Sequence, residues 1–168
     1  IMYSMEGFLK EISGMDAFTF QPGGGAQAVY SNASILKAYH TDRGEGEQRN
    51  EIITTVLSHP VNAAAPHTRG FKVINLMPEG DTGYPSLEQL RSVVSERTAG
   101  IFITNPEDTG IFNPLIKDMV DIVHEAGGLC IADIADANGL FGISRAKEVG
   151  YDMCHYNLHK AFASPHGS

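Results

Sequence analysis

Two residues in the last quarter of the chain have the types and the spacing for chemistry on an aldehyde cofactor. Asp133 stands in the apolar run 129–134, and Lys160 lies just past the run 153–156, about one helix and one strand later. A lysine amine can form an imine with an aldehyde, and an aspartate at the tip of a neighbouring strand can keep a pyridinium nitrogen protonated. Together they predict the protein half of a pyridoxal 5′-phosphate (PLP) site, in which Lys160 carries the cofactor and Asp133 makes its ring an electron sink.

Each candidate residue also has a structural interpretation when it is taken alone. Asp133 could cap a following helix, a role for which Asp136 competes, and Lys160 could be a solvated lysine. His59 follows the run 54–57 and could stack on an aromatic ring or be an ordinary structural histidine. These alternatives stay open at the level of single residues.

A glycine-rich segment, Gly23-Gly24-Gly25-Ala26, precedes a helical pattern. Glycines let backbone N–H groups approach an anion, and a helix N-terminus adds the positive end of its dipole. Gly24, Gly25 and Ala26 therefore suit a monophosphate. The alternative is a tight loop without a ligand, since the segment matches neither a Walker loop nor a G-x-G-x-x-G fingerprint.

Three histidines near the end of the chain, His155, His159 and His166, raise the question of a metal ion. Their spacings lack a second ligand pair of zinc-site form, and Cys130 and Cys154 stand in apolar runs where buried thiols are expected. We therefore expect no metal site.

The elements that must position these residues follow from the apolar pattern. Helical spacing runs through 1–12 and through 26–39. Further helices are predicted after the capping-box residues 86–89 and between Pro114 and Gly127. Short apolar runs rich in β-branched residues predict strands of the kind buried on both faces of a parallel sheet. These runs are 52–57, 71–76, 101–104, 129–134 and 153–156.

Strands that alternate with helices are typical of βαβ units. We therefore expect one α/β domain, a mainly parallel sheet flanked by helices. Ligands of such sheets bind beyond the carboxyl ends of the strands. The segment 104–106, Asp133 and the pair His159-Lys160 all fall at such ends, and this convergence favours the chemical interpretation.

Composition narrows the classes of function. The 168 residues are about the size of one domain, and 42% hydrophobic with 19% charged residues is typical of a globular protein. A net charge of −8 argues against nucleic acid or an anionic membrane as partner. No membrane-length apolar run or signal peptide is visible, and the two cysteines suit reduced thiols. We expect a piece of a longer protein in the cytoplasm, or in the mitochondrial matrix if the source is eukaryotic.

Several segments, in order and at compatible spacings, match the motifs of one known family. They are Phe20-Gln21-Pro22 with Gly25-Ala26-Gln27, residues 38–46 (AYHTDRGEG), Thr104-Asn105-Pro106 with Gly110-Ile111-Phe112, and residues 155–160 (HYNLHK) with Phe162 and Pro165-His166-Gly167. They resemble the glycine decarboxylase (P-protein) family of the glycine cleavage system, which belongs to the fold-type I PLP enzymes. The likeness covers about residues 20–166, and the match of residues 38–46 to AYHxxRGEG is highly specific.

The resemblance implies a fold and a reaction. The fold is a fold-type I PLP-dependent transferase-like large domain, of which residues 1–168 would be a truncated part without the small C-terminal domain. The reaction is PLP-dependent decarboxylation of glycine, with transfer of the aminomethyl group to the lipoyl group of a carrier (H) protein. Such proteins work as homo-oligomers or paired subunits, so exposed apolar surface is expected.

The resemblance also assigns roles around the cofactor. Lys160 would carry PLP and Asp133 would hold its ring nitrogen protonated. His59 would stack on the ring, and His159 would lie beside the imine as a proton carrier or phosphate contact. The residues expected to hold the phosphate through their backbone amides are Gly24, Gly25 and Ala26.

Some family positions differ in this chain. The family motif SAHGTNPAS appears as residues 57–65, which keep His59 and Asn62 but lose the flanking Gly and Pro, and its DGAN appears as residues 133–136, DIAD. Two alternatives therefore stay open. The chain could belong to another fold-type I PLP enzyme, such as an amino-acid decarboxylase or aldolase, or it could be an inactive structural or pairing fragment.

Overall fold

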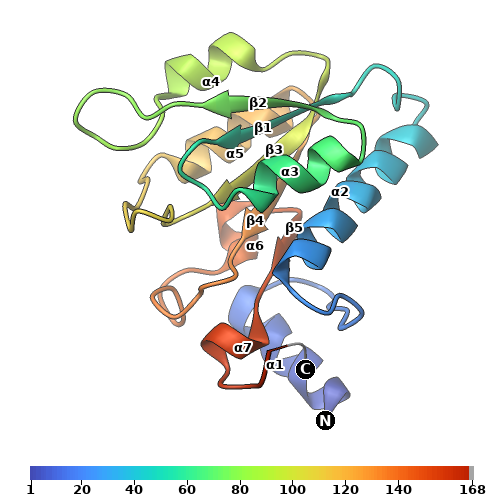
Figure 1. The fold of residues 1–168 in the computed structure, drawn as a ribbon, viewed down its shortest axis with the longest axis vertical. Coiled ribbons are helices and arrows are strands. Elements are labelled where there is room, and N and C mark those ends of the chain that lie inside the picture. The colour runs from blue at the N-terminus through green and yellow to red at the C-terminus, as the bar shows by residue number, and fades with distance from the viewer. Residues whose placement is uncertain (167–168) are drawn as a thin grey trace.

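The computed structural model describes residues 1–166, in which five parallel strands form one sheet of order β2-β1-β3-β4-β5 (Figure 1). Gly167, the last residue of the Pro165-His166-Gly167 motif, lies outside the described residues. The strands are β1 (Glu51–Thr55), β2 (Lys72–Leu76), β3 (Thr98–Thr104), β4 (Leu129–Asp133) and β5 (Met153–His155). The α/β expectation and all five predicted strands are confirmed.

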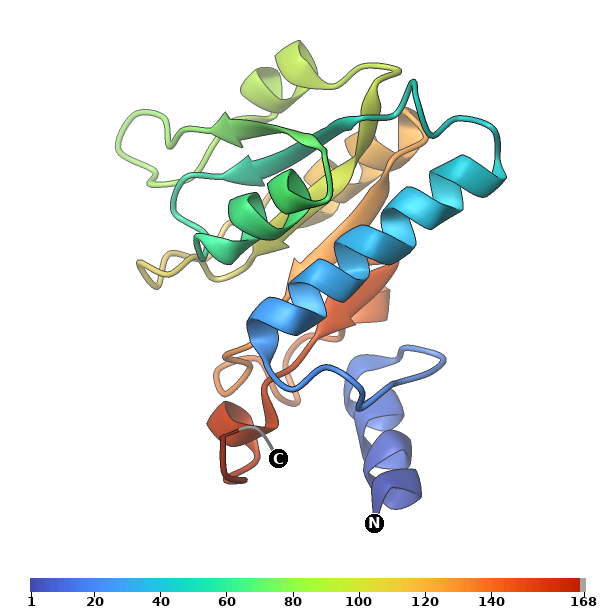
Figure 2. The ribbon, with the colours of Figure 1, turned by 45° about the vertical axis from the view of Figure 1, so that its right-hand side comes forward.

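Helices cover both faces of the sheet, as the turned ribbon shows (Figure 2). The helices are α1 (Met2–Ser13), α2 (Gly25–Asp42), α3 (Val61–Thr68), α4 (Leu87–Val93), α5 (Ile116–Glu125), α6 (Ala146–Val149) and α7 (Leu158–Ala161). Helices α2 and α3 pack on one face, and α4, α5 and α6 contribute to the core on the other.

The alternation of side chains along the strands produces two cores. Ile52, Phe102 and Ile131 point to the face of α2 and α3. Their sequence neighbours Ile53 and Ile101 point to the opposite face, where α5 supplies a buried apolar stripe. Because successive side chains of a strand point to opposite faces, a continuous apolar run fills both cores at once.

One strand departs from the expectation of burial on both faces. β2 lies at the sheet edge, and Lys72 and Asn75 in it are exposed. Its predicted start at Phe71 is also one residue early, although Phe71 is buried in the core of α2 and α3. An edge strand contacts fewer neighbours, which explains the polar residues in this run.

The predicted capping box at the start of α4 forms only in part. Ser86 Oγ accepts a hydrogen bond from the Gln89 backbone N–H at 3.1 Å, as a cap should. The Gln89 side chain does not return to the Ser86 amide. It accepts instead from the Met77 N–H and donates to Glu79, which anchors the loop after β2 to α4.

Among residues 1–166, no helix has both the length and the apolar character needed to cross a bilayer.

Candidate functional site

The carboxyl ends of three neighbouring strands bring the central residues of the site together. In the sheet register, Thr104 of β3 pairs with Asp133 of β4, and Asp133 pairs with His155 of β5. The segment that follows β1 adds His59 and Asn62 at the start of α3. The predicted convergence of strand ends is thus confirmed for Thr104 and Asp133.

Asp133 is held by three donors in a buried setting. Its side chain is 5% exposed. Oδ1 lies 3.0 Å from His155 Nε2 and accepts from the Ala135 backbone N–H at 3.1 Å. Oδ2 accepts from Asn62 Nδ2 at 2.9 Å. No helix begins at Asp133, so the helix-cap alternative for this residue is wrong, although its bond to Ala135 N–H forms a local turn.

These contacts keep Asp133 ionised. Burial alone would raise the pKa of this carboxyl, but the His155 ring, the Ala135 N–H and the Asn62 amide outweigh it and lower the pKa to about 2. A buried carboxylate that stays charged at neutral pH is a suitable partner for a cationic N–H. This property fits the role expected of Asp133.

Asn62 is the centre of the polar contacts beneath Asp133. It is fully buried, and its Nδ2 also lies 3.2 Å from Thr104 Oγ1 and 3.3 Å from Ser58 Oγ. Ser58 Oγ in turn lies 3.1 Å from Thr54 Oγ1 in β1. Among the described residues, Asn62 Oδ1 is buried without a hydrogen-bond partner.

His59 lies just before this amide and is exposed. Its Nδ1 accepts a hydrogen bond from the Val61 backbone N–H at 3.1 Å, which orients the ring at the start of α3. The bond to Val61 is a structural contact, so the structural alternative for His59 stays open beside the stacking role. An exposed ring at the end of β1 is available to stack on a flat ligand.

The glycine segment forms the N-terminus of the 18-residue helix α2. Within residues 1–166 this end has no side-chain cap and no acidic residue in its first turn. The first backbone hydrogen bond runs from the Ala28 N–H to the Gly24 C=O, so the amides of Gly25 and Ala26 have no partner within the helix. A Cβ on Gly24 would meet no described atom within 4 Å, so the space beside this residue is open.

Gly25 lies against the chain that follows β5. A Cβ at this position would come within 3.0 Å of the Asn157 side-chain amide. Asn157 is buried, and its backbone C=O accepts from the Lys160 N–H at 3.0 Å. Asn157 therefore contacts both the glycine segment, at Gly25, and the backbone of Lys160.

Lys160 lies in the short helix α7 and is exposed. The residue directly opposite Asp133 on the adjacent strand is His155, and Lys160 follows beyond the end of that strand, in α7. Among the described residues, no hydrogen bond or ion pair joins the Lys160 ammonium to another side chain. The ammonium is thus available to react, but the structure does not bring it into contact with Asp133.

His159 is partly exposed beside Lys160, and its ring lies 4.3 Å, between centroids, from the ring of His166. Partial burial, followed by the nearby His166 and Lys160, lowers the pKa of His159 below its usual value. A neutral imidazole next to the amine candidate suits a proton carrier.

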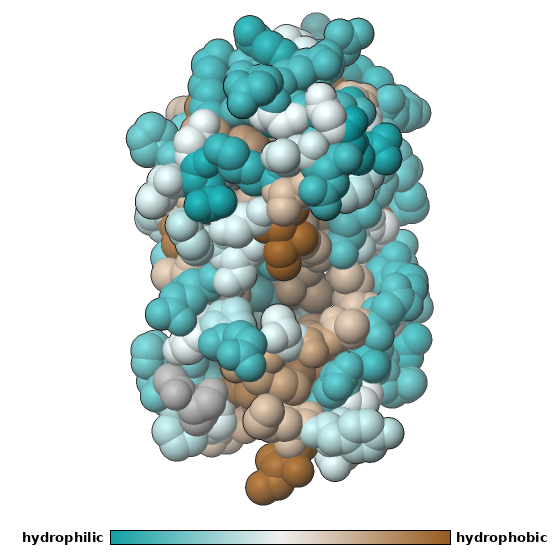
Figure 3. Space-filling view, turned by 90° about the vertical axis from the view of Figure 1, so that its right-hand side faces the viewer, coloured by the Kyte–Doolittle hydropathy of each residue, from teal (hydrophilic) through white to brown (hydrophobic). Residues whose placement is uncertain are grey.

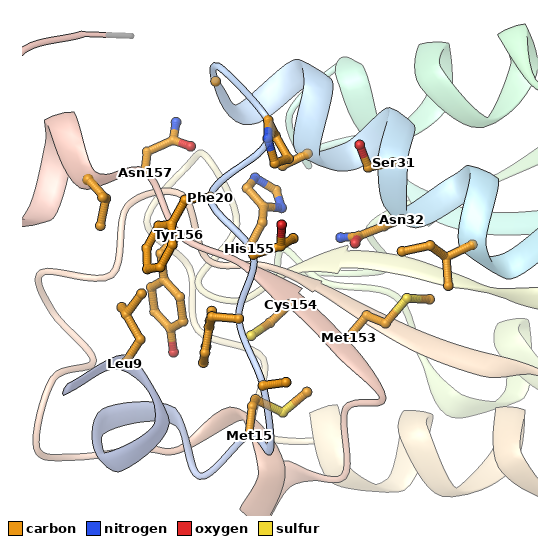
Figure 4. A pocket seen from close by; sticks show the side chains of 18 of the residues that line it. Leu9, Met15, Phe20, Ser31, Asn32, Met153, Cys154, His155, Tyr156 and Asn157 are labelled. Carbon is orange, nitrogen blue, oxygen red and sulfur yellow. The ribbon is translucent and has the colours of Figure 1, made fainter. Parts of the chain in front are cut away.

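Two hollows flank these residues. The larger, of about 270 Å³, lies between α1, α2 and β5 and is lined in part by Gly24, His155 and His159. Figure 4 shows Asn32 of α2 and His155 at the polar end of this hollow, with Leu9, Met15 and Phe20 on its apolar side. The smaller, of about 50 Å³, includes Asp133 and Tyr156. His155 thus lines the larger hollow and also bonds Asp133, which lines the smaller one.

Two partners of Asp133 have no predicted contact with it in the sequence. Asn62 is only a retained family residue there, and His155 is only one of several histidines. The only available signal was positional, because Asp133 and His155 both end predicted neighbouring strands. Asn62 comes from a helix 71 positions earlier, and no local pattern links it to Asp133.

The most specific motif, residues 38–46, lies away from this site. His40 is buried, with Nε2 2.9 Å from the Ala99 C=O at the start of β3 and Nδ1 3.3 Å from Glu45. Glu45 also pairs with Arg43 and Arg49. The motif therefore ties the end of α2 to the amino ends of the strands, opposite Asp133.

A different cluster brings together potential metal-binding atoms of His124, Cys130 and Asp152, all within 4.8 Å. The Asp152 carboxylate already accepts from His124 Nε2 at 2.8 Å and from the Cys130 N–H at 2.7 Å. Burial raises the pKa of the Cys130 thiol, which opposes the thiolate form that binds metals. The cluster is therefore better described as a structural contact between α5 and the loop before β5.

Comparison with known proteins shows the family to which the chain belongs. Residues 26–168 match the aminotransferase class-V family. Over 99% of its length the chain is 48% identical to a probable glycine dehydrogenase (decarboxylating) subunit 2 of Pyrococcus abyssi, and 43% identical to the protein of that name in Staphylococcus haemolyticus. It spans about a third of these relatives, 33% and 34% of their respective lengths.

Solved structures share the fold. A SepCysS–SepCysE N-terminal domain complex aligns with a TM-score of 0.78 at 16% identity, over 99% of this chain and 44% of that one. A NifS-like protein aligns with a TM-score of 0.76 at 21% identity, over 99% of this chain and 45% of that one. These alignments show that the chain shares the fold of these proteins over nearly its whole length.

Proposed function

The chain belongs to the aminotransferase class-V family, and from that premise we propose that it is the PLP-binding part of a glycine decarboxylase of the glycine cleavage system. The substrate would be glycine, and the acceptor of the aminomethyl group would be the lipoyl group of a carrier protein. The names of the relatives, glycine dehydrogenase (decarboxylating) subunit 2, support this choice over another PLP enzyme or an inactive fragment.

The residues present fit PLP at three points. The open, uncapped N-terminus of α2 at Gly24, Gly25 and Ala26 suits its phosphate. Asp133 suits its ring nitrogen, because the carboxylate is buried and ionised. Lys160 offers an exposed amine in α7, where its backbone N–H bonds the C=O of Asn157, the residue that lies against Gly25. The single observation that carries the proposal is the ionised Asp133 at the same sheet edge as an uncapped helix.

Bound PLP supplies the electron sink for the carbanion that remains when glycine loses carbon dioxide. The chain's own residues would prepare this chemistry. Asp133 would hold a proton on the ring nitrogen, His59 would cover one face of the ring, and His159 would carry protons near Lys160. Residues 1–168 would form part of the large domain, with the small domain elsewhere in the longer protein.

The name "subunit 2" of the relatives implies a second subunit, and we extend this to the chain as a proposal. Exposed apolar side chains on α1 support it, notably Tyr3 and Phe8. Figure 3 shows apolar residues gathered along the middle of one face of the molecule. A cytoplasmic or mitochondrial setting would suit the free cysteines Cys130 and Cys154.

Chemical labelling tests the proposal directly. We expect PLP added to the chain, followed by borohydride reduction and peptide mapping, to place the phosphopyridoxyl group on Lys160. Three other lysines are internal controls, because their ammonium groups are held by Arg69 C=O, Glu51 and Asp121. These controls are Lys37, Lys72 and Lys117. Labelling confined to them, or labelling that persists in Lys160→Ala, would contradict the assignment.

A further inference from the structure

Asp133 has an unequal set of partners on its two oxygens. Oδ1 receives two donors, His155 Nε2 at 3.0 Å and the Ala135 N–H at 3.1 Å. Oδ2 receives one, Asn62 Nδ2 at 2.9 Å. A carboxylate offers about four lone-pair positions, two on each oxygen. One position on Oδ2 therefore stays available, whereas both positions on Oδ1 are used.

His155 is fixed in the orientation that produces this arrangement. The position of His155 results from its pairing with Asp133 across β4 and β5. The side chain is 6% exposed, so the ring has little freedom to turn away. Because Asp133 Oδ1 can only accept when ionised, His155 must carry a proton on Nε2 to bond it.

The other ring nitrogen of His155 makes no competing contact with the described residues, since Nδ1 is buried without a hydrogen-bond partner among them. Nε2 is therefore the ring nitrogen that donates, and its bond to Asp133 Oδ1 is the polar contact that orients the ring. The Asn62 amide and the Ala135 N–H donate to the same carboxylate, and these three contacts leave one position on Oδ2 for a further donor.

We propose that His155 is a positioning residue that, together with Asn62, turns Asp133 so that Oδ2 accepts the N–H of a cationic heteroaromatic ring. The inference rests on the proposed function, in which that ring is the pyridinium of PLP, and it adds two residues with defined tasks. His155 occupies Oδ1 as a hydrogen-bond donor, and Asn62 fixes the plane of the carboxylate from the side of α3. Neither residue itself needs to touch the cofactor.

Ring nitrogen recognition can be measured apart from catalysis. The probe is the ratio of the Kd for 1-deazapyridoxal 5′-phosphate, in which C–H replaces the ring nitrogen, to the Kd for PLP. A hydrogen bond to a charged group is worth about 1.5–3 kcal/mol, so we expect the unaltered chain to prefer PLP by roughly tenfold or more. His155→Phe should reduce this preference several-fold, and His155→Gln, which keeps a hydrogen-bond donor, should restore part of it.

The matched control is His124→Phe. His124 also bonds an aspartate, Asp152, at 2.8 Å. Asp152 directly precedes β5, whereas Asp133 is the last residue of β4. This variant should keep the full preference for PLP. An unchanged ratio in His155→Phe, or an equal loss in His124→Phe, would overturn the proposal.

A second readout does not depend on cofactor binding. The carboxyl carbon of Asp133, observed by NMR at about pH 4, near the ordinary aspartate pKa, should report an ionised group in the unaltered chain and a largely protonated one in His155→Phe. In the unaltered chain, ring nitrogen shifts should show His155 with its proton on Nε2. A proton on Nδ1 instead would overturn the proposal even if His155→Phe fails to fold. If the chain binds neither ring compound, the proposed function fails, and the NMR results alone decide the role of His155.

Discussion

Asp133 and Asp136 have the same side chain and stand three positions apart, yet their surroundings differ. Asp133 is buried and accepts from His155, Ala135 and Asn62. Asp136 is exposed and accepts from Asn138 Nδ2 at 3.0 Å. A charge in a buried, low-dielectric setting interacts more strongly with a ligand cation than a charge in water does. This contrast supports Asp133, rather than Asp136, as the proposed partner of the ring nitrogen.

Replacing each aspartate tests the assignment. Asp133→Asn should weaken PLP binding by roughly tenfold or more, because a charge-assisted hydrogen bond to the ring nitrogen is lost. Asp136→Asn should change the Kd by less than about twofold, as expected for an exposed polar contact. Fluorescence titration with PLP provides both values. A larger effect at Asp136 would mean that the strand end has been placed incorrectly.

The pKa of Asp133 also predicts how stability depends on pH. Its value falls from 3.8 to about 2 in the folded state, so the unfolded state binds protons first. The stabilisation is fully present above pH 3.8 and is lost as the pH falls through about 2, and it amounts to roughly 2 kcal/mol. Urea unfolding of the chain and of Asp133→Asn should therefore give free energies that converge over this acid range. Parallel curves would show that the carboxyl is not held ionised by folding.

Helix α2 runs from the carboxyl ends of the strands, where the candidate site lies, to their amino ends. Its N-terminus presents Gly24 and Gly25 beside β5, and its C-terminus carries the motif at residues 38–46. There the buried His40 joins the Ala99 C=O to Glu45. The motif that is most specific in sequence thus contributes to the docking of α2, and the site depends on it only through the position of the helix.

Substitution at His40 should separate stability from ligand binding. His40→Leu leaves a buried C=O without its donor and should lower the free energy of unfolding by about 1–3 kcal/mol. The Kd for PLP should stay unchanged below the melting transition, since His40 lies opposite Asp133. His67→Leu, at an exposed histidine of α3, is the control and should have little effect on either measurement. A loss of PLP affinity in a folded His40→Leu variant would contradict the structural role.

The described residues leave the Lys160 end of the candidate site exposed. β5 pairs only with β4 among residues 1–166, and Lys160 lies exposed beyond it. The chain spans about a third of the length of the relatives it matches. Electrostatic stabilisation of a carbanion depends on dry, pre-organised surroundings, which an exposed amine does not have.

We therefore expect the chain by itself to be a poor decarboxylase even if it binds PLP. Exchange of labelled bicarbonate into the carboxyl group of glycine, with PLP and lipoylated carrier protein, should be at least about a hundredfold slower than for a full-length relative with its partner subunit. Comparable exchange by the chain alone would show that these residues hold a complete site.

The amino-acid sequence by itself determined the local elements. The five strands and the main helices follow from apolar periodicity, because that signal depends only on neighbouring residues. The sequence also placed Asp133 at a strand tip and Gly24–Ala26 at a helix start. The strand limits follow the apolar runs less closely, since β1 ends at Thr55, two residues before its apolar run does.

Only the tertiary structure decided which side chains meet. The contact of Asn62 with Asp133 joins residues 71 positions apart, and the pairing of Asp133 with His155 depends on the order and register of the strands. Strand order and register result from the packing of helices on both faces of the sheet, which is a property of the whole chain and leaves no local pattern in the sequence.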